Sequence, residues 1–188
     1  MKTRRKIIQN GLSIAFLAGS ALFFGCATED HYVPLNPPKV KFGEFKHVEL
    51  KETALADREN TPGNQKNAKK IDELLLAGLT SFWPDIKVVH LGESLSKGGE
   101  RTLQIVPQIE HIKIVSTGAR IWVGAMAGDS DLVMHVDYYD SATGEVIAGP
   151  DFSRGNNSFS GNMTYGQSDN QVRDAIVTQI VGYTARNK

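Results

Sequence analysis

An uncharged apolar run near the N-terminus decides which part of this chain can fold into a domain. Residues 1–6 read MKTRRK, with four basic side chains and no acid, and Gly11–Gly25 follow without a charged residue. A membrane-spanning helix needs about 20 apolar residues, whereas a secretory signal peptide joins a basic segment to a shorter apolar one. The sequence therefore predicts a signal peptide over residues 1–25, with the folded domain downstream.

The single cysteine of the chain, Cys26, comes directly after this run, in the segment Leu22–Cys26 (LFFGC). The segment resembles a bacterial lipobox, in which the thiol takes a diacylglycerol and signal peptidase cleaves before the cysteine. The resemblance implies lipidation of Cys26, with palmitate among the acyl groups. The alternative is a buried structural cysteine in an ordinary secreted or signal-anchored protein. A single cysteine excludes an intramolecular disulfide in either case.

The residues around this signal also bear on export and location. Thr3–Ile8 (TRRKII) resemble a twin-arginine export signal, which stays open beside the general secretory route. Ala27 and Thr28 stand where an aspartate usually retains a lipoprotein in the inner membrane, so the resemblance implies the outer membrane, facing the periplasm. Cleavage would leave 17 Lys and Arg against 21 Asp and Glu, a formal charge of −4. This balance predicts no nucleic-acid partner and no polybasic membrane signal.

The chain after the signal divides into a spacer and one domain. Residues 26–40 hold the lipidated cysteine and three of the seven prolines, Pro34, Pro37 and Pro38. Proline favours an extended, semi-rigid path, so this stretch is predicted to be a tether between membrane and domain. Residues 41–188 are long enough for a single domain with its own core.

Hydropathy periods within residues 41–188 predict an α+β domain. Spacings of three and four from Ala68 to Phe82 predict a helix with Asn67 as N-cap and Pro84 beyond its end, after a polar loop over Asp57–Asn67. A capping box at Ser168 opens a closing helix. Strands are predicted over 44–55, 86–91, 103–115, 119–127, 131–140 and 145–148. This order favours an antiparallel or mixed sheet with two helices packed on one face.

The strand predicted over 103–115 changes phase along its length. Its apolar positions shift from odd to even numbers after Ile109, and Pro107 lies inside the run. Such a slip indicates either a β-bulge or an edge position.

Two motifs in the second half of the domain resemble those of a known family. They are a glycine-punctuated strand with Gly118, Arg120, Gly124 and Gly128, and a turn of the form D-x-x-T-G-E with Asp140, Thr143, Gly144 and Glu145. Both resemble a family of uncharacterised bacterial lipoproteins, catalogued only as a domain of unknown function. More distantly, the order of elements looks like that of the curli-secretion and penicillin-binding-protein-activator lipoproteins. Those are binding or assembly components, so the resemblance implies a non-enzymatic role without catalytic residues.

Motifs for catalysis or metal binding are not found. The five histidines show neither H-x-x-x-H nor H-E-x-x-H spacing, and no G-x-S-x-G elbow, Walker loop or calcium loop is present. The sequence therefore predicts no enzyme activity, no cofactor and no metal site. His111, His135 and Asp137 lie on strands predicted to be neighbours and could converge. They would then be either the polar face of a sheet or the site of an envelope hydrolase.

Residues 150–167 are read as a long loop rich in Gly, Asn and Ser. It carries the apolar side chains Phe152, Phe159, Met163 and Tyr165. Aromatic anchors among small polar residues suit a surface that recognises a partner. The alternative is that these side chains pin the loop over the sheet.

Together these features favour a non-enzymatic outer-membrane lipoprotein whose periplasmic domain binds, or helps to assemble, an envelope partner. A carrier of a small ligand or lipid, with an apolar cleft between helices and sheet, is the alternative, and an envelope hydrolase is a third hypothesis. The identity of the partner and the oligomeric state stay open.

Overall fold

The computed structural model describes residues 37–93, 101–114, 130–156 and 169–188, which belong to one compact unit running from Pro34 to Lys188. Several predicted features lie outside the described residues: the signal peptide, Cys26, the tether up to residue 36, the strand over 119–127 with its four motif residues Gly118, Arg120, Gly124 and Gly128, and Ser168.

The described strands form one mixed sheet of seven in the order β3-β1-β4-β5-β6, with β2 beside β4 and β7 beside β5. β1 runs parallel to both β3 and β4, and β2 is also parallel to β4. β5 is antiparallel to β4, β6 and β7. The strands are β1 (His47–Lys51), β2 (Ala54–Leu55), β3 (Lys87–Val89), β4 (Thr102–Lys113), β5 (Ser130–Asp140), β6 (Glu145–Ala148) and β7 (Asp151–Asn156).

The phase slip in β4 is a β-bulge, and the alternative edge position is wrong because β4 lies inside the sheet. The register with β5 shifts between Ile109 and His111. Pro107 sits where the neighbour on the other side changes, since β1 pairs with β4 as far as Ile105 and β2 resumes at Gln108. Proline has no N–H to offer a neighbouring strand, which accounts for the break between β1 and β2 beside it.

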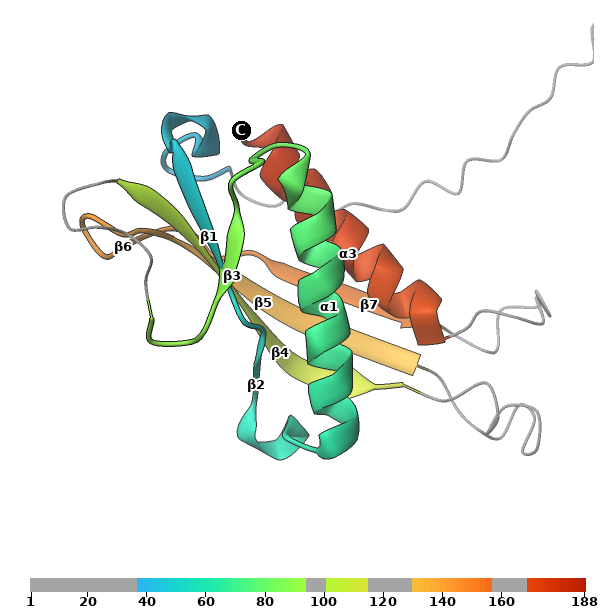
Figure 1. The fold of residues 1–188 in the computed structure, drawn as a ribbon. Coiled ribbons are helices and arrows are strands. Elements are labelled where there is room, and N and C mark those ends of the chain that lie inside the picture. Colours follow the sequence, from blue (N-terminus) through green and yellow to red (C-terminus); the bar gives the residue numbers. More distant parts are fainter. Residues whose placement is uncertain (1–36, 94–100, 115–129, 157–168) are drawn as a thin grey trace, which may run out of the picture. The chain divides into compact units, whose positions relative to one another are not determined.

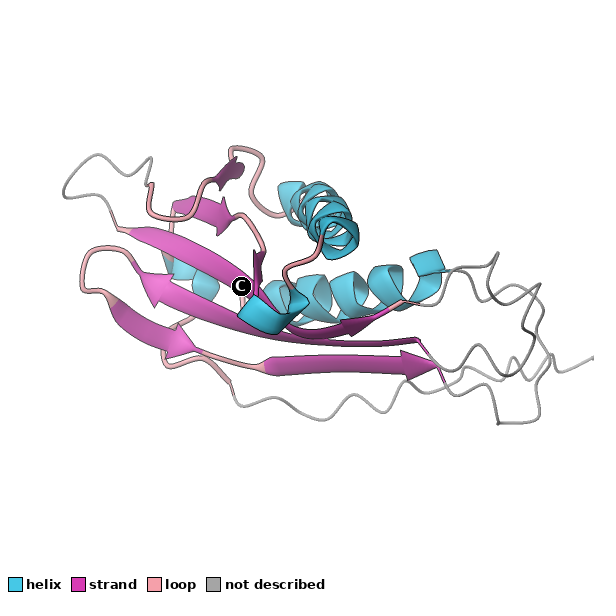
Figure 2. Cartoon of the chain, turned by 90° about the horizontal axis from the view of Figure 1, so that it is seen from below, coloured by secondary structure: helices cyan, strands magenta, loops and turns pink. Residues whose placement is uncertain are grey.

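Two helices, α1 (Pro62–Thr80) and α3 (Asp169–Arg186), lie on one side of this sheet, as the two views in Figure 1 and Figure 2 show. The predicted α+β architecture is therefore confirmed. In α1 the residues turned to the core recur every three or four positions: Ala68, Ile71, Leu75 and Leu79. No helix in the described part of the chain is long and apolar enough to cross a membrane.

Helix α1 begins earlier than the sequence predicted. Asn67 is not its N-cap, because Thr61 takes that place and its hydroxyl accepts a hydrogen bond from the Asn64 N–H at 3.2 Å. Pro62 and Gly63 form the first turn of the helix and not a loop. Proline suits the first helical position because its fixed φ is helical and its missing N–H has no partner there anyway. The preceding polar stretch contains a short 3-10 helix, η2 (Asp57–Glu59).

The core lies between the sheet and the two helices. In β5 every second side chain, from Leu132 to Tyr138, is buried toward them. A 3-10 helix at the start, η1 (Phe42–Glu44), joins the same core, since the Phe42 ring stacks on Tyr138 with centroids 4.6 Å apart. The Phe42 N–H also donates to the Asn187 carbonyl at 2.8 Å, which ties η1 to the end of α3.

Residues 151–156, which the sequence placed in a loop, form strand β7 along β5. The Phe152 side chain is 3% exposed and meets Tyr183 edge-on, with ring centroids 6.0 Å apart. The aromatic residues of this stretch were expected either to contact a partner or to pack onto the sheet. Phe152 packs into the core. Phe159, Met163 and Tyr165 lie outside the described residues.

Candidate functional site

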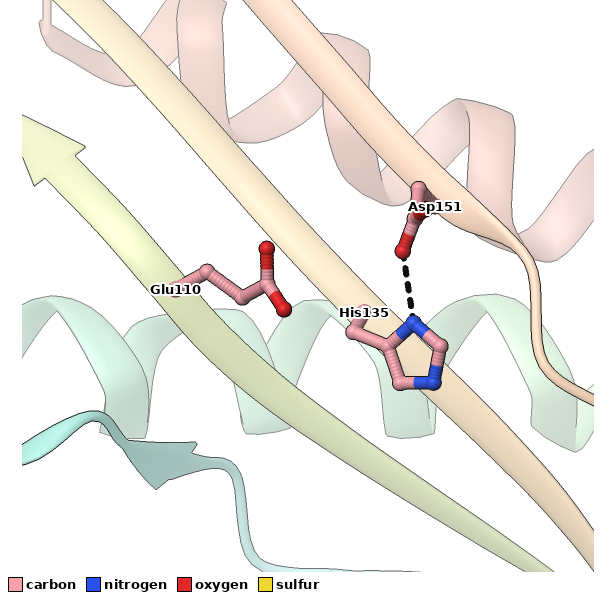
Figure 3. Close-up of side chains that lie close together, drawn as sticks. All are labelled: Glu110, His135 and Asp151. Carbon is pink, nitrogen blue, oxygen red and sulfur yellow. Dashed lines mark hydrogen bonds and ion pairs between the residues drawn. The ribbon is translucent and has the colours of Figure 1, made fainter.

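The face of the sheet turned away from the helices carries a group of ionisable side chains. Side chains alternate along a strand, so the residues between the buried positions of β5 point to this second face. This second face of β5 carries His135, Asp137 and Tyr139 at successive outward positions. Asp151 on β7 and Glu110 on β4 flank them, and Figure 3 shows Glu110, His135 and Asp151 in front of the strands with the helices behind. These five residues are called the polar cluster below.

His135 is held by carboxylates at both ring nitrogens. Its Nδ1 lies 2.6 Å from Asp151 Oδ1 and its Nε2 lies 3.2 Å from Asp137 Oδ1. The Tyr139 hydroxyl donates to the other oxygen of Asp137 at 3.1 Å. The imidazole orientation is thus fixed by its neighbours, one of which is itself held by Tyr139.

These contacts shift the protonation of the cluster. Partial burial alone would lower the pKa of His135, but the hydrogen bonds and charges of Asp151 and Asp137 outweigh it and raise the pKa above the usual value of 6.5. Burial, together with Asp137, raises the pKa of Tyr139. An imidazole that keeps its proton is a poor general base, so this arrangement is better suited to holding charge than to taking protons from a substrate.

A glycine allows the cluster to be this compact. A Cβ atom at Gly149 would lie 2.9 Å from Asp137 Oδ1 and 3.4 Å from the His135 ring. Any side chain there would push the carboxylate and the imidazole out of place. Gly149 therefore leaves the room in which Asp137 can reach His135.

The predicted convergence of His111, His135 and Asp137 is only partly seen. His135 and Asp137 meet, whereas His111 Nδ1 lies 3.0 Å from Glu59 Oε1, beside η2. The strand register separates the two histidines, because His111 lies opposite Val133, whereas Gln108 is the β4 residue opposite His135.

Three members of the polar cluster, Glu110, Tyr139 and Asp151, were missed by the sequence analysis. The alternation predicted over residues 131–140 put Tyr139 on the same face as Asp137, but no contact between the two was inferred from it. Asp151 was hidden because its segment was assigned to a loop.

The predicted turn motif makes the β5–β6 hairpin, where its residues have structural roles. The N–H of Gly144 donates to the Asp140 carbonyl at 2.8 Å, and Gly144 has the positive φ of 71° that favours glycine. The Thr143 hydroxyl accepts from the Glu145 N–H at 3.2 Å. The Glu145 carboxylate pairs with Lys39 at 2.7 Å on the surface.

Asp140 is the buried member of this turn. Its carboxylate accepts from Arg101 Nε at 2.6 Å and from the Ala142 N–H at 3.0 Å, and its side chain is 5% exposed. Burial alone would raise the pKa of Asp140, but these two hydrogen bonds and the guanidinium charge outweigh it and lower the pKa below 3.8.

A pocket of about 610 Å³ lies at the edge of the sheet where the parallel strands β1, β3 and β4 begin. Its walls combine aromatic side chains, such as Phe82 and Trp83, with charged ones, such as Lys87 and Lys188. This pocket is not the apolar cleft that the carrier hypothesis predicts between the helices and the sheet. In that region, buried side chains of α1, α3 and the strands pack into one cluster.

Comparisons with known proteins bear on the fold. The chain matches no protein-family model and no curated protein. Two structures of the PelC dodecamer from Paraburkholderia phytofirmans are similar to it, with TM-scores of 0.53 and 0.50. They are 12% and 14% identical, and the matches cover 79% of this chain and 93% and 92% of PelC. At such identities the likeness shows a shared fold.

Two further solved structures are similar at lower scores. A DUF330 protein from Xanthomonas campestris is 13% identical, with a TM-score of 0.48 over 80% of this chain and 88% of its own. A minor lipoprotein from Acinetobacter baumannii is 12% identical, with a TM-score of 0.34 over 74% of this chain and 91% of its own.

Proposed function

We propose that this chain is a lipoprotein of the bacterial cell envelope, anchored through Cys26, that works without catalysis as a component of a protein assembly. The observation that carries the proposal is the order of its parts. A signal-like segment ends at the only cysteine, a proline-rich tether follows, and one compact domain comes last. Acyl chains on Cys26 would hold this domain at the outer membrane, facing the periplasm.

The fold supports an assembly role over an enzymatic one. PelC, which shares the fold, is described as a dodecamer, and we propose that this domain likewise acts in contact with other protein chains. The polar cluster places His135 between two carboxylates that raise its pKa, which does not favour its use as a general base in hydrolysis. Phe159, Met163 and Tyr165 remain the proposed contacts for a partner.

Anchoring is tested by labelling cells with radioactive palmitate and separating their membranes on a sucrose gradient. The wild-type chain should carry label and sediment with the outer membrane, whereas Cys26→Ala should be unlabelled and recovered in the periplasm. A Cys26→Ala chain that stays in the membrane, or restores a deletion strain fully, would contradict the anchoring part of the proposal.

The assembly role is tested by crosslinking in cells, followed by affinity purification and mass spectrometry. Either a ladder of this chain or reproducible enrichment of one envelope protein is expected. Phe159→Ala with Tyr165→Ala should reduce that crosslink while the purified chain keeps its circular dichroism spectrum. Phe152→Ala is the contrasting variant, because its ring is buried and its loss should lower stability instead.

The alternatives make different predictions. A carrier would copurify with a ligand visible by native mass spectrometry. A hydrolase would need the polar cluster, so a deletion strain fully complemented by Asp137→Ala and His135→Ala would dispose of it. Absence of any crosslinked partner together with a bound ligand would overturn the assembly role in favour of the carrier.

A further inference from the structure

We propose that Glu110, His135 and Asp151 bind one divalent transition-metal ion, with Zn²⁺ as the representative ion, on the sheet face opposite the helices. This proposal does not depend on the proposed envelope function. The three side chains come from three adjacent strands, β4, β5 and β7, and point toward one another (Figure 3).

The distances suit a single ion after a small adjustment. One ligand atom from each side chain can be chosen so that all three lie within 4.8 Å of one another. On a tetrahedral zinc with bonds of about 2.0–2.2 Å, neighbouring donor atoms are about 3.3–3.6 Å apart. Glu110 and Asp151 are exposed, so the Glu110 carboxylate can approach His135, and the Asp151 carboxylate, whose Oδ1 lies 2.6 Å from Nδ1, can move back, without disturbing the core.

The imidazole is already oriented as a metal ligand would be. Histidines that bind metals usually donate their second ring N–H to a carboxylate, which fixes the tautomer and the ring direction. Here Asp137 lies 3.2 Å from Nε2 and is itself bound by the Tyr139 hydroxyl. Nδ1 is left facing Asp151, where an ion would replace the proton between them.

The backbone makes room for this arrangement. A Cβ at Gly149 would collide with Asp137 Oδ1 at 2.9 Å and press on the His135 ring at 3.4 Å. The glycine therefore keeps the supporting carboxylate against Nε2, and with it the direction of Nδ1.

Charge and donor type indicate which ion fits. Three carboxylates, from Glu110, Asp137 and Asp151, surround one imidazole, so even a protonated His135 leaves the cluster negative. A divalent cation balances this charge better than a proton does. One nitrogen and two oxygen donors suit zinc and its first-row neighbours, and three protein ligands leave a position for water or another ligand.

Histidine spacing in the sequence does not reveal such a site, because each ligand comes from a different strand. Strand pairing creates it, since β5 places His135 opposite Asp151 of β7, and the alternation of β4 ahead of its bulge puts Glu110 on the same face. A bound ion would join three strands and hold β7 against β5.

Calorimetric titration tests the site. The full-length chain with Cys26→Ala, which removes the thiol as a competing ligand, is stripped with EDTA and titrated with ZnCl₂. One ion per chain is expected, and ion content after gel filtration should agree by mass spectrometry. Asp151→Asn, Glu110→Gln and His135→Gln should each weaken binding by about tenfold or more, and Asp137→Asn, as a positioning variant, by about 10- to 100-fold.

The matched control is a second exposed histidine–carboxylate pair. His90 Nδ1 lies 2.7 Å from Glu52 Oε2, so His90→Gln should leave the affinity unchanged. If His135→Gln fails to fold, Asp151→Asn decides, because its side chain is 72% exposed and its removal leaves the core intact. Zinc should also raise the unfolding temperature of the parent chain and not that of Asp151→Asn.

Two outcomes would overturn the proposal. One is the absence of saturable zinc binding by the parent chain, which would leave the polar cluster as a proton-held ion network. The other is zinc binding that does not depend on the polar cluster. This would be shown if folded Asp151→Asn and His135→Gln bound zinc as tightly as the parent chain, or if His90→Gln weakened binding as much as they do.

Discussion

Among single residues, Asp140 shows how a motif that looks functional can be structural. Its carboxylate is buried and accepts from Arg101 and from the Ala142 N–H. Asp140→Asn removes the charge that Arg101 binds, so the free energy of unfolding at pH 7 should fall by about 1–2 kcal/mol, less than for a fully enclosed pair because Arg101 is partly exposed. Urea denaturation followed by circular dichroism measures it.

The same variant has a defined pH dependence. Because folding lowers the pKa of Asp140, its contribution to stability is complete above pH about 5 and is lost as the pH falls below about 4. The stability difference between wild type and Asp140→Asn should therefore shrink in acid. Glu145→Gln is the control from the same turn, since its pair with Lys39 is exposed and should change stability by less than about 1 kcal/mol. A difference that does not shrink at all between pH 7 and pH 3 would contradict this account.

Residue-level inference from the sequence succeeded where alternation was regular. The period of β5 placed His135 and Asp137 on one face, and they do meet. His111 was misplaced because the register is invisible in one sequence: His111 lies opposite Val133, while Gln108 occupies the position opposite His135. The glycine at 149, on which the polar cluster depends, has no recognisable sequence signal.

Between elements, the contact of α1 with α3 depends on Gly78. A Cβ at this position would lie 2.7 Å from Val181 Cγ2. Gly78→Ala should therefore destabilise the protein by about 1–3 kcal/mol through overpacking, although alanine is the better helix former. Adding Val181→Ala removes the clash, so in that background Gly78→Ala should raise stability by up to about 1 kcal/mol.

A double-mutant cycle by thermal and urea unfolding checks this sign change. Gly63→Ala is the control, because the nearest atom to a Cβ there is the Thr61 hydroxyl oxygen at 4.0 Å. It should shift stability by less than about 1 kcal/mol. Equal effects of Gly78→Ala with and without Val181 would show that the helices do not touch at this point.

The elements themselves were predicted with uneven success for physical reasons. The buried period from Ala68 to Leu79 identified α1, since a helix face must match the core it covers. Its start was missed because Pro62–Gly63 suits a turn as well as a first helical turn, and only the Thr61 cap distinguishes them. β7 was missed because its composition is poor in strand formers, and pairing along β5 outweighs that local preference.

In the unit from Pro34 to Lys188, the first and last described elements are joined to one core. In η1, the Phe42 ring packs against Tyr138 and Tyr183. The Phe42 N–H donates to the carbonyl of Asn187, which directly follows α3. First and last elements thus depend on each other, with the sheet between them. A core shared in this way favours unfolding in a single step.

A chain that begins at Pro34 should therefore fold without the preceding residues and unfold in one cooperative transition. Trp122→Phe leaves Trp83 as the only tryptophan, and its 6% exposed side chain reports on the end of α1. Its fluorescence and the far-ultraviolet circular dichroism signal should give the same urea midpoint. That midpoint should match the midpoint of a Cys26→Ala chain that begins at residue 26, since the compact unit begins at Pro34. Midpoints that differ between the two probes would mean that helices and sheet unfold separately, which is incompatible with a core that both of them enclose.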